Sequence, residues 1–115
     1  MNWQRELNSL LGLRSEGQDW GIENSDPSRV IELIEFFEQH VSSHPWEPEA
    51  LAELIIQSAQ EGLESGSLTE EEKVKFKSFF AEHRHFFPVT SSYWLGLNEF
   101  EWQIVRLLRE VRTGA

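Results

Sequence analysis

Apolar residues recur every three or four positions along most of the chain, which is the spacing of one face of an α-helix. This pattern predicts five helices, over about residues 2–11, 27–41, 48–66, 70–84 and 98–112. The second helix is strongly amphipathic, with apolar residues from Val30 to Val41 and glutamates on its flanks and outer face. No internal repeat interrupts the pattern. The sequence therefore predicts an all-α, single-domain bundle of about five helices over residues 1–115.

Capping residues mark three of the predicted helix starts. The pairs are Asp26 with Pro27, Thr69 with Glu72, and Asn98 with Glu101. The first pair joins an N-cap to a favoured first-turn residue, and the other two have the spacing of a capping box. Local chemistry therefore predicts helices that begin near residues 27, 70 and 98.

Two connections are longer than the usual link between helices, from about Arg14 to Ser25 and from His85 to Leu97. Residues 86–97 mix β-branched and aromatic residues, a composition that fits either an ordered loop or a short hairpin. The loop is the favoured interpretation. The two connections hold Trp20, Tyr93 and Trp94, and Trp46 lies just before the third helix. Large aromatic residues at such positions are candidate anchors for a partner.

Charge is distributed unevenly along the chain. Residues 30–72 contain 11 glutamates and no Lys or Arg, so this segment carries a formal charge of −11 within a total of −10. A field of one sign attracts cations and basic proteins, and it repels nucleic acid and anionic lipid. The charge pattern therefore predicts a basic protein partner, with no nucleic acid and no membrane.

The acidic segment has two interpretations. Glutamate is a good helix former, and a charged outer face keeps a small domain soluble. However, an ordinary exposed helix mixes the two signs to form pairs four residues apart, and this segment has no Lys or Arg to do so. That absence favours a binding role. The candidate partner-binding residues are Glu32, Glu35, Glu38, Glu49, Glu53, Trp20, Trp46, Tyr93 and Trp94.

Candidate chemistry is sparse. The chain has no Cys, no glycine-rich phosphate loop and no catalytic motif, so we expect neither an enzyme nor a cofactor. The sequence predicts no metal site, because His83 and His85 lie two residues apart and the helix around His40 and His44 should fray.

With 39% hydrophobic and 12% aromatic residues, the chain should fold alone as a monomer. Without cysteines or a long apolar stretch, it is expected in the cytoplasm.

In size, acidity and helix pattern, the chain resembles bacterial immunity proteins, including those of contact-dependent growth inhibition and colicin-type systems. The resemblance is one of overall character and rests on no motif. It implies a protein that binds one basic, nuclease-type toxin domain and blocks its active site or substrate surface. Two other hypotheses stay open: a helical adaptor that binds its partner through an apolar groove, and a small metal-dependent hydrolase that uses His83, His85 and nearby glutamates.

Overall fold

The computed structural model describes residues 3–41 and 47–113, and all regular elements within these ranges are helical. The elements are α1 (Trp3–Leu11), α2 (Trp20–Asn24), η1 (Pro27–Arg29), α3 (Val30–His40), α4 (Pro48–Ser65), α5 (Glu70–His83), η2 (Arg84–Phe86), α6 (Pro88–Leu95) and α7 (Gln103–Thr113), where η marks a 3-10 helix. The predicted all-α class is confirmed. The predicted number of about five helices is too low, because both long connections contain a further α-helix.

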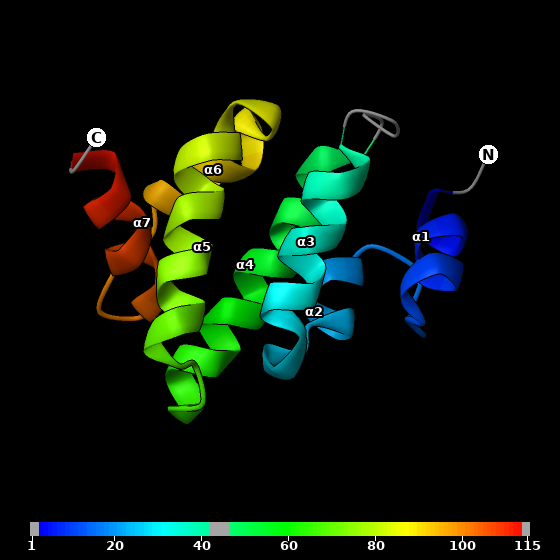
Figure 1. Cartoon of the computed structure of the whole chain (residues 1–115), viewed down its shortest axis with the longest axis horizontal. Helices are drawn as coiled ribbons and strands as arrows, with labels where there is room; N and C mark the ends of the chain where they lie inside the picture. Colours follow the sequence, from blue (N-terminus) through cyan, green and yellow to red (C-terminus); the bar gives the residue numbers. More distant parts are fainter. Residues whose placement is uncertain (1–2, 42–46, 114–115) are drawn as a thin grey trace.

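The central element is α4, and α1 and α7 lie at opposite ends of the long axis of the molecule (Figure 1). Helix α4 packs against α2, α3, α6 and α7. It is therefore buried on several sides, and Leu54, Ile55, Ile56 and Ala59 have no exposed surface. The sequence pattern places Ile56 at the edge of the apolar stripe, but the additional neighbours cover this position as well.

Aromatic side chains fill the space between α3 and α5. The ring of Phe37 lies edge-on to Phe79, with 5.1 Å between the centroids, and Phe79 stacks on Phe87 at 5.4 Å. Phe37 and Phe87 are fully buried, and Phe79 is almost so. These contacts set the packing of α3 against α5, and with it the positions of the polar residues along both helices.

The connection over residues 14–25, predicted as a loop, contains α2. Its first residue, Trp20, is only 2% exposed, and the indole N–H donates to Asn8 Oδ1 of α1 over 2.7 Å. Helix α2 approaches α4 closely at Gly21, where an added Cβ would lie 2.9 Å from Cγ of Glu53. Trp20 is therefore a core residue, because the short helix turns its ring inward between α1 and α4.

The preferred loop over residues 86–97 is also wrong, since most of this segment is α6, and no strand occurs in the described ranges. The residue before the helix, Phe87, offers no capping oxygen of its own. Instead, the Glu49 carboxylate from α4 accepts hydrogen bonds from the N–H groups of Val89 and Thr90, over 3.1 and 2.8 Å. The cap comes from another helix, so the local sequence does not reveal it.

The last helix begins at Gln103, later than predicted. The Asn98 side chain accepts from the N–H of Phe100 over 2.8 Å and so closes a turn ahead of the helix. Phe100 is 90% exposed and lies outside the core. The N–H of Ile104 donates over 2.7 Å to Oε1 of Gln60, which is buried on α4. A side chain of α4 thus caps α7 as well as α6.

Two of the capping predictions are confirmed by hydrogen bonds. Thr69 and Glu72 form both bonds of a capping box, over 3.1 and 2.8 Å. Asp26 accepts from the N–H of Ser28 over 3.0 Å, although η1 precedes α3 at this point.

None of the helices in the described ranges combines the length and the apolar content that crossing a membrane requires.

Candidate functional site

The glutamates of the acidic segment have different roles in the structure. Glu49 caps α6, and Glu53 accepts from the indole N–H of Trp94 over 2.6 Å. Glu32 forms a two-point pair with Arg29, over 2.8 and 2.6 Å, which lowers the pKa of Glu32 chiefly through the hydrogen bond. These contacts stabilise the fold. Among the five glutamates predicted to bind a partner, Glu35 and Glu38 remain to form a shared surface.

The predicted aromatic anchors also differ in their burial. Trp20 and Trp94 are each 2% exposed and belong to the core. Tyr93 is 57% exposed on α6, next to Val89, which is 73% exposed one turn earlier. Trp46 lies outside the described residues. Tyr93 is therefore the predicted anchor that the described structure leaves on the surface.

A groove of about 500 Å³ runs between α3 and α5, and its lining is mainly acidic. Its lining residues are Ile31, Glu35 and Glu38 from α3, and Glu71, Val74, Lys75, Ser78 and Glu82 from α5. Four glutamates and one lysine give the lining a formal charge of −3. Val74 is 64% exposed and adds an apolar contact surface. We call this feature the α3–α5 groove.

The wall of this groove is held together by an interhelical contact at Glu38. One carboxylate oxygen accepts from Nζ of Lys75 and the other faces Nε2 of His83, each over 3.1 Å. Burial alone would raise the pKa of Glu38, but the hydrogen bonds from Lys75 and His83 outweigh it, so the pKa lies below its usual value. The charged form of Glu38 therefore joins α3 to α5.

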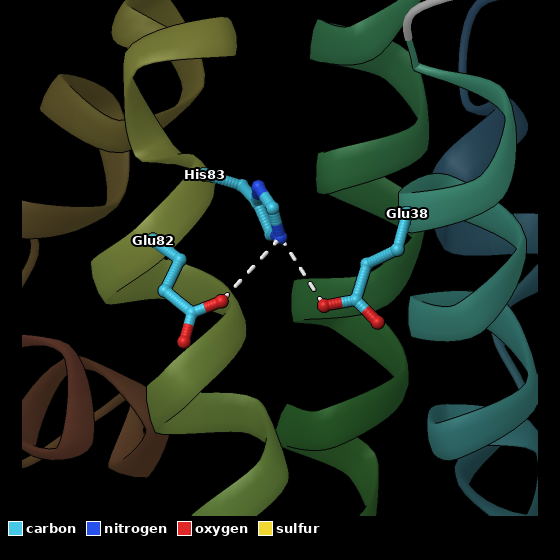
Figure 2. A group of neighbouring side chains, drawn as sticks. All are labelled: Glu38, Glu82 and His83. Atoms are coloured by element: carbon cyan, nitrogen blue, oxygen red, sulfur yellow. Dashed lines mark hydrogen bonds and ion pairs between the residues drawn. The ribbon is translucent and has the colours of Figure 1, made fainter.

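Glu82 completes a compact group with Glu38 and His83. Figure 2 shows the His83 ring projecting from α5 between the two carboxylates, and Nε2 lies 3.9 Å from Glu82. One ligand atom of each residue lies within 4.8 Å of the other two, so the structure assembles a set of possible metal ligands here. A metal ion would have to replace the proton on Nε2 and share Glu38 with Lys75. The second histidine of the hydrolase hypothesis, His85, lines a different pocket.

Sequence reasoning missed Glu71, Val74 and Glu82 as site residues. Positions 71, 74, 75, 78 and 82 recur at helical spacing and therefore share a face of α5, just as 31, 35 and 38 share a face of α3. That periodicity was available in the sequence. Whether these two sets of residues face each other depends on how α3 and α5 pack. The sequence pattern did not specify that packing.

Comparisons with family models, curated proteins and solved structures gave no match to this chain.

Proposed function

We propose that this protein is an immunity protein that binds a basic, nuclease-type toxin domain and blocks its active site or substrate surface. The observation that carries the proposal is the α3–α5 groove, where Glu35, Glu38, Glu71 and Glu82 lie along one open surface with an exposed Val74. Nucleases bind phosphates through basic side chains, and a row of carboxylates offers the same charge to those side chains. The proposed contact surface is therefore this groove.

Charge in the groove favours fast and selective association. Opposite potentials on two partners accelerate their encounter, and salt screens this effect. Glu35 and Glu71 are exposed, and neither side chain has a hydrogen bond or ion pair to another described residue. Their carboxylates are therefore available to a partner without breaking a contact of the fold. Val74 supplies the apolar contact that holds a complex after encounter.

The first test is a pull-down from lysate of the native host at low salt, followed by elution in a salt gradient and mass spectrometry. We expect one basic domain that elutes only at high salt. Expression of that domain alone should arrest growth, and co-expression of this protein should restore it. A neutral partner that elutes without regard to salt, or a domain without toxicity, would contradict the proposal.

The second test compares two variants that remove the same charge. In the groove variant, Glu35→Gln with Glu71→Gln, we expect association with the recovered domain to slow about tenfold or more at low salt. The control variant, Glu23→Gln with Glu101→Gln, changes two exposed glutamates outside the groove lining and should associate like the wild type. Equal rates for both variants would show that the groove is not the binding surface.

One observation supports the alternative of a helical adaptor. Val89 and Tyr93 lie one turn apart on α6 and are 73% and 57% exposed, which gives α6 an apolar outer stripe. A partner bound there would be held mainly by apolar burial and would respond little to salt. Loss of binding in Val89→Ser with Tyr93→Ser, without an effect of the groove variant, would favour this second function.

A further inference from the structure

A second pocket, of about 560 Å³, lies between η2 and α6 and has a different chemistry from the α3–α5 groove. Its polar lining comes from Arg84, His85, Ser91 and Ser92, and no Asp or Glu lines it. In a chain with 20 acidic and 10 basic residues, a pocket of this composition is unexpected. We call it the Arg84 pocket.

Arg84 is unusual among the cationic side chains of this protein. The structure describes nine Lys and Arg side chains, and seven of them form an ion pair with a glutamate. Within the described residues, Arg84 and Arg14 have no such pair. Arg14 is exposed to solvent, whereas Arg84 is half-buried at the wall of a pocket. Its charge therefore has no carboxylate partner among the described residues at a place where a ligand could reach it.

The guanidinium of Arg84 is held in position by an aromatic ring. Its central carbon lies 5.7 Å from the centroid of Phe80, which is fully buried. A cation at this distance is attracted by the face of the ring, and its N–H groups can still donate to a carboxylate or a phosphate. The contact therefore prepares Arg84 for an anion at little further cost in side-chain entropy.

Ser91 supplies an independent indication of a ligand. Ser91 lines the pocket, yet the residue is only 7% exposed. The hydroxyl has no hydrogen-bond partner among the residues described in ranges 3–41 and 47–113. Because buried hydroxyl groups are normally hydrogen-bonded, an unpartnered one at a pocket wall indicates a missing acceptor. An anion next to Arg84 would provide that acceptor.

We propose that the Arg84 pocket binds the anionic group, a carboxylate or a phosphate, of a small organic molecule. The Arg84 guanidinium provides the charge, and the Ser91 and Ser92 hydroxyls donate hydrogen bonds to the same group. Pro88 and Leu95 cover the apolar part of the ligand. The volume lies within the range typical of small-molecule sites. At physiological salt, glutamates that lie more than about 8 Å from the pocket are screened and do not oppose binding.

Nuclear magnetic resonance titration of the ¹⁵N-labelled full chain tests this proposal. The probes are phenyl phosphate and benzoate, with sodium chloride at equal ionic strength as a blank. We expect saturable shifts at the Arg84 side-chain N–H and at the amides of Ser91, Ser92 and Gly96, which all belong to the pocket. A response to phenyl phosphate alone assigns a phosphate ester, one to benzoate alone assigns a carboxylate, and one to both assigns anions of either kind.

Three variants separate a site from general charge attraction. Arg84→Gln should weaken binding at least tenfold and Ser91→Ala several-fold. Arg14→Gln removes the other described Arg side chain without an ion pair and should leave binding unchanged. Dispersed amide spectra of each variant would show that it is folded. If Arg84→Gln unfolds the chain, Ser91→Ala and Arg84→Lys carry the test, since lysine keeps the charge without the planar fork. Unsaturable shifts, or equal affinity in Ser91→Ala and the wild type, would overturn the proposal.

Discussion

Substitution of Glu49 distinguishes most clearly between a structural role and a binding role for a glutamate of the acidic segment. The sequence suggests that its carboxylate faces a partner, whereas in the structure it binds two N–H groups at the start of α6. A second contact joins the same elements, because the Thr90 hydroxyl donates to the Glu49 carbonyl oxygen over 3.2 Å. Substitution of Glu49 by Ala removes the first contact and leaves the second intact.

The cost of Glu49→Ala follows from the exposure of the two donors. Val89 is 73% exposed, so water can replace the carboxylate at its N–H group. Thr90 is only 9% exposed, and its N–H group would lose its partner. Hydrogen bonds to charged groups contribute about 1.5–3 kcal/mol, and the loss of a helix cap costs about 1 kcal/mol. We therefore expect the free energy of unfolding to fall by about 2 kcal/mol.

Urea unfolding followed by tryptophan fluorescence measures this loss, since Trp94 lies in the same helix. With an m-value of about 1.5 kcal/mol/M, the midpoint should fall by about 1.3 M. Glu49→Gln keeps one oxygen acceptor and should lose about half as much free energy. Glu35→Ala is the matched control, because it removes the same charge from an exposed position and should stay within about 0.5 kcal/mol of the wild type. Equal effects of Glu49→Ala and Glu35→Ala would refute the capping role.

Three further predictions address the core, the second interhelical cap and the groove wall. Phe37→Ala should lower the free energy of unfolding by about 3–5 kcal/mol, measured by calorimetry, because the ring is fully buried among other aromatic rings. Gln60→Leu should leave the Ile104 N–H without its acceptor, cost about 2 kcal/mol and speed amide exchange at Ile104; unchanged exchange would contradict the cap. Because the pKa of Glu38 is lowered on folding, its charge stabilises the protein above about pH 4.3 and this contribution is lost as pH falls through the lowered pKa. Stability measured against pH should therefore decline less steeply in Glu38→Gln than in the wild type below about pH 4.3, and parallel curves would contradict the linkage.

The candidate site was partly accessible from the sequence. The missing Lys and Arg between residues 30 and 72 drew attention to an acidic surface, and Glu35 and Glu38 of α3 do line the groove. The other wall comes from α5, of which only Glu70, Glu71 and Glu72 fall within that segment. The sequence could not distinguish Glu49 and Glu53 from groove residues. Their hydrogen-bond partners, Thr90 and Trp94, lie in α6 and are each 41 residues further along the chain.

The sequence by itself determined the helical class and those helix ends that depend on neighbouring residues. Thr69 with Glu72 begins α5, and Gly66, with a φ of +73°, ends α4, because both signals act within one turn of chain. Pro88 is a local signal for a helix start, but tertiary structure decided that residues 88–95 form a helix and that α7 starts at Gln103. In both cases the side chain that binds the first N–H groups belongs to α4. Such a partner is supplied only when the helices have packed, so no local pattern could announce it.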